Sequence, residues 1–276
     1  MASEIPDYTV VLGVDGNYVE QLKLVLPTWV KHKPSLFRRP WVVFYDRSSL
    51  PYFDLLRALE PYFQAVGGTG GVRFFSWPDQ GVVYPHDPSS RFGDGQRAKM
   101  LAGFVHVPAE HVLTPYWLKL DLDVVATGKD DWIRAEWFDE TPAIIAHPWG
   151  YTKPAAQVLQ LDEWADKHGI FDAEHPPLKL APAPGSDLVR HKRIISWCGF
   201  FSTRFTQRAS INVNLRCGYQ QLPVPSQDGL MHYMARRGGE GVVRTSMKNC
   251  GWKHCHGINS IRDAIKQQET PIAKLS

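Results

Sequence analysis

Runs of consecutive apolar residues divide the chain into short segments that have the length of buried β-strands. The first two runs cover residues 8–14 (YTVVLGV) and 41–45 (WVVFY), and an aspartate follows each of them. Between them, residues 18–31 carry apolar side chains near helical spacing, although Pro27 is expected to bend or end the helix. A strand, a helix and a second strand in this order predict a parallel pair with a right-handed crossover. The pattern therefore predicts an α/β fold with a mostly parallel central sheet flanked by helices.

The alternation of strands and helices continues toward the end of the chain. The glycine-rich stretch 67–71 lacks the G-x-G-x-x-G order of a dinucleotide-binding loop. Residues 172–188 are rich in proline and are predicted to be a long loop, either a lid or binding loop or a disordered segment. Further strands are predicted at residues 72–77, 143–147, 194–203 and 242–246, and further helices at 51–63, from 96 onward, at 155–168 and at 229–239.

Two carboxylates end the apolar run within residues 116–127 (YWLKLDLDVVAT), and they are the main candidate for chemistry. Asp121 and Asp123 are separated by one residue, and Val124 and Val125 are expected to continue the strand. Two neighbouring carboxylates repel each other unless one is protonated or a cation lies between them. Oxygen ligands of this kind suit Mg²⁺ or Mn²⁺ bound together with phosphates. The alternative interpretation is that the two acids only flank a turn.

Two pairs of charged residues are candidates for binding a nucleotide. Asp15 and Asp46 follow the first two strands, at the sheet edge where α/β proteins bind ligands, and are candidates for a nucleoside's base or ribose. The alternative is that each only caps a turn or a helix. Arg97 and Lys99 precede the carboxylate strand and are candidates for phosphate contacts. The alternative for these two is a solvated helix face.

The segment KNCGWKHCHG supplies a second group of candidate residues near the C-terminal end. His254 and His256 are one residue apart, beside Lys253, so an imidazole is available for a metal and an ammonium group for a phosphate. Cys255 lies between them, but no set of four soft ligands at the spacing of a structural zinc site is present. Earlier in the chain, Asp228 stands in the first turn of a predicted helix, where it is either catalytic or a capping residue.

Composition narrows the classes of partner. The chain has 276 residues, of which 43% are hydrophobic, so it is long enough for one large α/β domain or two small ones. The formal charge of +3 is small and the basic residues are scattered, which argues against nucleic acid. Four cysteines do not make a disulfide framework in a chain of this length, and ten tryptophans favour a carbohydrate ligand because flat aromatic faces stack on sugars.

No segment of the sequence indicates a membrane or secretory location. No run reaches 18 apolar residues, and the N-terminal sequence MASEIPDYT has no basic segment followed by an apolar one. We therefore expect no transmembrane segment and a cytoplasmic location.

Taken in order, these motifs resemble the GT-A fold glycosyltransferases, and their order is closest to the glycogenin-like retaining enzymes. The D-x-D pair, the strand with an internal glycine, Gln-Asp before a helix and the C-terminal H-x-x-G of His254 carry the resemblance over residues 8–257. The K-P-W that follows in that family is absent, because Gly257 leads into INSIRDA. The resemblance implies a single Rossmann-like domain over residues 1–276, with a nucleotide-binding half at 1–123 and an acceptor-binding half at 124–276.

The resemblance also implies an activity: metal-dependent transfer of a hexose from a nucleoside-diphosphate sugar, with UDP expected, to a carbohydrate or other hydroxyl acceptor. Asp121, Asp123 and His254 would hold Mn²⁺ or Mg²⁺, and His254 is selected over its neighbour His256 by the H-x-x-G spacing. Lys253 and Arg97 would offset the charge on the departing diphosphate. With Asp123, Asp228 is the predicted catalytic residue: a general base if the reaction inverts the anomeric carbon, or a sugar contact if it retains it.

Two other classes of protein remain as alternatives. The string LDLDVVATG is also similar to the first motif of haloacid-dehalogenase phosphatases, in which the first aspartate is a nucleophile. That motif is expected near the start of a chain and with a later G-D-x-x-x-D, and neither condition holds. A non-catalytic sugar-binding protein would use the tryptophans but has no need of the acidic pair.

Overall fold

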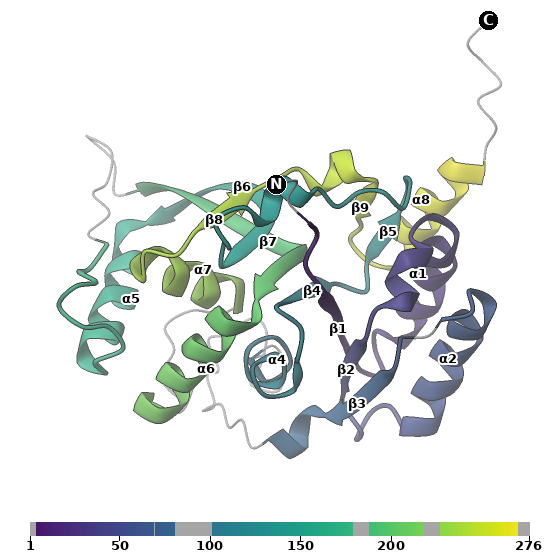
Figure 1. Cartoon of the computed structure of the whole chain (residues 1–276), viewed down its shortest axis with the longest axis horizontal. Coiled ribbons are helices and arrows are strands. Elements are labelled where there is room, and N and C mark those ends of the chain that lie inside the picture. Colours follow the sequence, from purple (N-terminus) through teal and green to yellow (C-terminus); the bar gives the residue numbers. More distant parts are fainter. Residues whose placement is uncertain (1–3, 69, 81–100, 179–187, 218–226, 270–276) are drawn as a thin grey trace, which may run out of the picture.

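A seven-stranded sheet forms the centre of the molecule, which is a computed structural model that describes residues 4–68, 70–80, 101–178, 188–217 and 227–269 (Figure 1). Its strand order is β3-β2-β1-β4-β7-β6-β8. All neighbours are parallel except β7, which runs antiparallel to both β4 and β6. The strands are β1 (Tyr8–Val14), β2 (Trp41–Tyr45), β3 (Val72–Ser76), β4 (Tyr116–Leu120), β6 (Ile144–Pro154), β7 (Leu188–Ser202) and β8 (Val242–Arg244).

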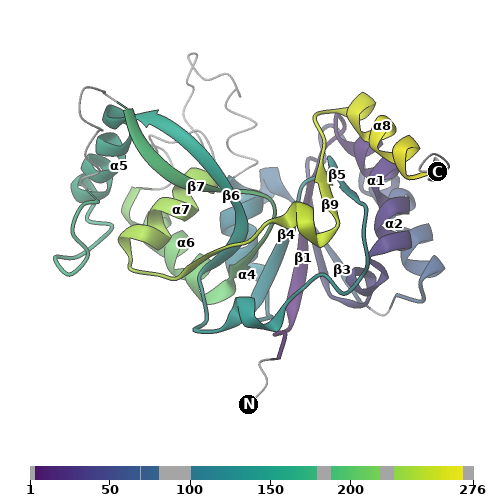
Figure 2. The same ribbon diagram turned by 90° about the horizontal axis from the view of Figure 1, so that it is seen from above.

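Helices cover both faces of this sheet, which explains why its strands are continuous apolar runs rather than alternating ones. Val10, Leu12 and Val14 of β1 belong to a core shared with the helices on one side, whereas Val11 belongs to a second core on the other side. Figure 2 shows the two groups of helices on opposite sides of β1 and β4. One group is α1 (Val19–His32), α2 (Tyr52–Ala65) and α8 (Ile258–Glu269), and the other is α4 (Val107–His111), α5 (Ala155–Lys167), α6 (Thr203–Cys217) and α7 (Gln227–Arg237).

The fold class predicted from the sequence, a mostly parallel sheet flanked by helices, is confirmed. Several element boundaries differ from the sequence pattern. Helix α1 continues through Pro27 to His32, because Leu26 and Trp29 on either side of the proline are fully buried and their packing offsets the cost of the missing hydrogen bond. Strands β6 and β7 are longer than predicted, since they pair with each other along an extended antiparallel ladder.

The sequence pattern suggested that Val124 and Val125 continue β4, and this prediction is wrong. The chain turns at residues 121–123, and Val124–Ala126 (β5) leaves the central sheet to pair antiparallel with Trp252–His254 (β9). The second sheet lies against α1 and α8, where both valines are fully buried (Figure 2). The two valines are thus removed from water on this second surface, as they would be in a longer β4.

Gly199 of β7 allows a close approach of β6. A Cβ atom at Gly199 would lie 3.1 Å from both the Cβ of Ala146 and the carbonyl oxygen of Ile145. The register of β6 against β7 shifts between Ala146 and His147, directly beside this glycine.

None of the helices in the described part of the chain has the length and apolar character needed to cross a bilayer.

Candidate metal centre

Two segments that are more than 120 residues apart in the sequence meet where β4 ends. The backbone N–H of Asp121 donates to the carbonyl oxygen of Trp197 (2.8 Å), which extends the β4–β7 ladder by one residue. On the other side of the turn, the N–H of Cys255 donates to the carbonyl of Asp123 (2.8 Å), and His254 pairs with Val124. These backbone contacts fix the acidic turn and the start of the C-terminal segment side by side.

The side chains of Asp121, Asp123 and His254 form a cluster in which one ligand atom of each lies within 4.8 Å of the others. Nε2 of His254 is 3.3 Å from Oδ1 of Asp123. That carboxylate oxygen is buried and accepts no hydrogen bond from the residues that the structure describes. A buried carboxylate oxygen is normally hydrogen-bonded or ion-paired, so this arrangement fits a site for a cation. Two carboxylates and one imidazole form a mixed oxygen and nitrogen donor set, which suits Mn²⁺ better than the oxygen-preferring Mg²⁺.

Lys119 lies beneath this cluster and was not singled out from the sequence. Its Nζ is 2.7 Å from Oδ1 of Asp121, and its side chain is only 4% exposed. Burial alone would lower the pKa of Lys119, but the carboxylates of Asp121, Asp228 and Asp123 raise it overall. Burial raises the pKa of Asp121 against the opposing effect of Lys119, and Asp123 raises it further. The sequence did contain a signal, because a lysine inside the apolar strand YWLKL requires a buried partner.

An aromatic wall supports the histidine of the cluster. The ring of His254 is stacked on that of Trp197, with centroids 5.5 Å apart and planes 4° apart. His147 lies 5.5 Å from the same indole, and the ring of His256 is 4.7 Å from that of His254 in an edge-on arrangement. Burial and the nearby Lys248 lower the pKa of His147. No local sequence pattern connects Trp197 or His147 with the acidic turn, because the sheet alone brings them together.

Asp228 and Tyr18 lie at the margin of the cluster. Asp228, in the first turn of α7, accepts a hydrogen bond from the side chain of Gln227 (2.6 Å) and contributes to the raised pKa of both Lys119 and Asp121. Burial raises the pKa of Tyr18, and Asp15, Asp123 and Asp121 raise it further. The fold therefore places Asp228 and Tyr18 within electrostatic reach of the acidic turn.

The structure gives local partners to the other candidates for nucleotide binding. Oδ1 of Asp15 accepts the backbone N–H groups of residues 17 and 18, and Oδ1 of Asp46 accepts the N–H and hydroxyl of Ser48. Both aspartates thus stabilise the turns that follow β1 and β2, at the sheet edge that includes the acidic turn. Lys253 donates to Gln267 of α8 (3.0 Å) and is exposed, as is His256. Arg97 and Lys99 lie outside the described residues.

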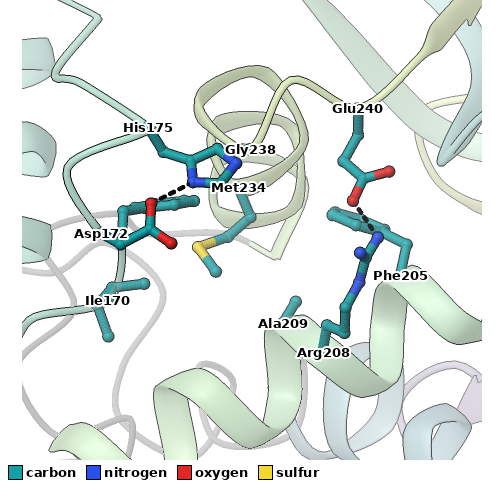
Figure 3. A pocket seen from close by; sticks show the side chains of 10 residues that line it. Ile170, Asp172, His175, Phe205, Arg208, Ala209, Met234, Gly238 and Glu240 are labelled. Atoms are coloured by element: carbon teal, nitrogen blue, oxygen red, sulfur yellow. Dashed lines mark hydrogen bonds and ion pairs between the residues drawn. The ribbon is translucent and has the colours of Figure 1, made fainter.

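A separate hollow of about 200 Å³ lies between α6, the end of α7 and the loop at residues 170–175 (Figure 3). Its charged side chains are paired with one another: Nδ1 of His175 is 2.6 Å from Asp172, and Arg208 contacts Glu240. Both acids of the hollow are thus hydrogen-bonded to a basic side chain, whereas Oδ1 of Asp123 accepts no hydrogen bond from the described residues. We place the candidate site at the acidic turn for this reason.

The architecture is that of the GT-A fold, as the resemblance in the sequence implied. The chain superposes on core-mannan synthase A from Aspergillus fumigatus, solved in an Mn/GDP form, with a TM-score of 0.53 and 11% identity, over 91% of this chain and 75% of that one. It is also similar to the mannosyltransferase Ktr4p from S. cerevisiae in complex with GDP, with a TM-score of 0.51 and 11% identity, over 90% of this chain and 71% of that one. No protein-family model and no curated protein sequence matches the chain.

Proposed function

We propose that this chain is a metal-dependent glycosyltransferase that moves a sugar from a nucleoside-diphosphate sugar to an acceptor hydroxyl. The observation that carries the proposal is the cluster of Asp121, Asp123 and His254 on a GT-A sheet, with a buried carboxylate oxygen that lacks a hydrogen-bond donor among the described residues. The cluster follows β4, at the edge of the sheet where α/β proteins bind nucleotides.

The residues of the cluster have distinct roles in this proposal. Asp121, Asp123 and His254 bind the divalent cation, for which Mn²⁺ is the expected ion. When bound, the cation supplies positive charge that stabilises the diphosphate leaving group. Asp228 lies near the same turn and is the proposed general base of an inverting reaction, or the sugar contact of a retaining one.

The identity of the donor is the finer part of the proposal. The resemblance to glycogenin-like enzymes favours UDP, whereas the two similar structures were described with GDP, so both nucleotides belong in the test. Of the alternatives, a haloacid-dehalogenase phosphatase would use Asp121 as a nucleophile, but the sequence lacks the later G-D-x-x-x-D motif of that class.

The decisive measurement is calorimetry of UDP and of GDP binding, with Mn²⁺ and with a chelator. We expect one of the two to bind in the presence of Mn²⁺ and to lose roughly ten-fold or more in affinity in the chelator or in Asp123→Ala. Asp54→Ala, which removes an exposed carboxylate on α2, is the matched control and should bind as the wild type does. Equal nucleotide affinity with and without metal would contradict the proposal, as would Mg²⁺-dependent hydrolysis of generic phosphate esters that is lost in Asp121→Asn.

A further inference from the structure

Lys119 is an unusual residue for the centre of a sheet. The neighbouring positions of β4 are fully buried apolar residues, and Nζ of Lys119 lies over the ring of Phe104, 4.5 Å from its centroid. The position opposite Lys119 on β7 is Gly199, which has no side chain. Burying an ammonium group is costly unless it is paired, so the position requires the carboxylate that it contacts.

The contact with Asp121 follows from the geometry of the strand. Side chains two positions apart on a strand point to the same face, and Asp121 continues the direction of β4 through its hydrogen bond to Trp197. Nζ of Lys119 reaches Oδ1 of Asp121 at 2.7 Å, on the carboxylate that also belongs to the metal cluster. The ammonium group and a bound cation therefore act on the same side chain.

The ammonium group of Lys119 balances part of the negative charge around the acidic turn. Among the described residues, Asp121, Asp123 and Asp228 supply three carboxylates that act on Lys119. One ammonium group leaves two negative charges, which one divalent cation neutralises. Without Lys119, the carboxylates of Asp121 and Asp123 would repel each other before any metal binds, and this repulsion would destabilise the fold.

We propose that Lys119 is a built-in counter-cation of the metal centre, which positions Asp121 in the metal-free protein and weakens the affinity of the site for a metal ion alone. The inference rests on the proposed function, because it assumes that Asp121 and Asp123 bind a cation. Its consequence is that the ion binds tightly only when a diphosphate contributes further negative charge and ligands. Lys119 is thus a positioning residue and not a catalytic one.

The test is the binding of Mn²⁺ alone, followed by the electron paramagnetic resonance signal of the free ion, in the wild type and in Lys119→Met. The methionine keeps the length of the apolar stem and removes the charge. We expect Lys119→Met to bind Mn²⁺ roughly ten-fold or more tightly than the wild type, to have a lower Tm without metal, and to gain more in Tm from Mn²⁺. Lys119→Arg, which keeps the charge, should restore an affinity close to that of the wild type.

Lys33→Met is the matched control. Lys33 is also fully buried, but its Nζ donates to the backbone carbonyls of Lys129 and Cys250 rather than to an acid of the cluster. This variant should lose stability and keep the Mn²⁺ affinity of the wild type. A merely structural role for Lys119 would give the same result in Lys119→Met, which would overturn the inference.

Variants that fail to fold are also informative. If Lys119→Met is unfolded without metal, Mn²⁺ should restore its fold, since the ion replaces the missing positive charge; Lys119→Gln provides a second neutral variant that still donates a hydrogen bond. Failure of Mn²⁺ to restore either variant would contradict the proposal. Failure of the proposed function has a different signature, because the wild type would then bind Mn²⁺ and no nucleoside diphosphate.

Discussion

Alternation along short extended segments decides which side chains reach the candidate metal centre. On β9, Trp252 and His254 point to one face and Lys253 to the other, where it meets α8. The side chain of Trp252 is buried in the core. His254 lies on the same face of β9, and its imidazole reaches the acidic turn. His256 lies just past the strand and is exposed, although its ring contacts that of His254.

Substitution of the two histidines should therefore have unequal effects on metal binding. We expect His254→Ala to raise the Mn²⁺ concentration for half-saturation roughly ten-fold or more, because it removes a ligand. His256→Ala should change it by less than about two-fold, since neighbouring exposed side chains contribute little. Titration of each variant with Mn²⁺ measures both values, and the opposite ranking would assign the ligand to His256.

At the scale of elements, the packing of β2 against η3 (Ala102–His106) shows how closely the backbone segments approach. The ring of Phe44 is fully buried between two glycines, and it packs edge-on against Phe104 at 4.9 Å. A Cβ atom at Gly103 would lie 1.8 Å from that ring, and one at Gly13 of β1 would lie 2.3 Å from it. The side of the sheet that carries Lys119 and Phe104 depends on this close approach.

Gly103→Ala should destabilise the protein. The added methyl group forces the Phe44 ring out of a closely packed site, which costs up to about 3 kcal/mol and is only partly offset by a gain of about 1 kcal/mol in helix propensity. The free energy of unfolding from urea titration measures the difference. Gly71→Ala is the control, because its Cβ would meet no atom within 4 Å and its φ is not positive; there we expect a change within about 0.5 kcal/mol.

At the scale of the whole molecule, the candidate metal centre joins two distant parts of the chain. The acidic turn follows the central sheet, whereas His254 belongs to the segment that leads into α8, and α8 packs on α1 and β5. The two core clusters lie on opposite faces of the same sheet. A ligand shared by the turn and by β9 would thus stabilise the folded molecule against global unfolding.

Thermal unfolding should report this link. At a Mn²⁺ concentration about 100 times the dissociation constant, the folded state gains roughly 2.7 kcal/mol, which corresponds to a Tm rise of about 5 to 10 °C for a chain of this size. A chelator should remove the rise, and Asp123→Ala should show none. A rise of equal size in that variant would place the stabilising ion elsewhere on the protein.

The sequence by itself determined the fold class and the composition of the candidate site. Continuous apolar runs indicate strands that are buried on both faces. An acidic pair at the end of such a run indicates a cation, because neighbouring carboxylates repel each other. Both inferences depend only on residues that are close together in the sequence. The order of the motifs added the GT-A resemblance. The confirmed sheet includes the runs at Tyr8–Val14, Trp41–Tyr45 and Tyr116–Leu120.

Only the tertiary structure decided how the site is assembled. Val124 leaves β4, and β5 then pairs with β9. This pairing and the stack of His254 on Trp197 both join residues that are far apart in the sequence. Local patterns carry no information on such pairs, because an apolar residue is removed from water equally well on either of two buried surfaces. Lys119 lies between these cases: its burial was implied by its strand, but its partner was fixed only when the turn placed Asp121 on the same face.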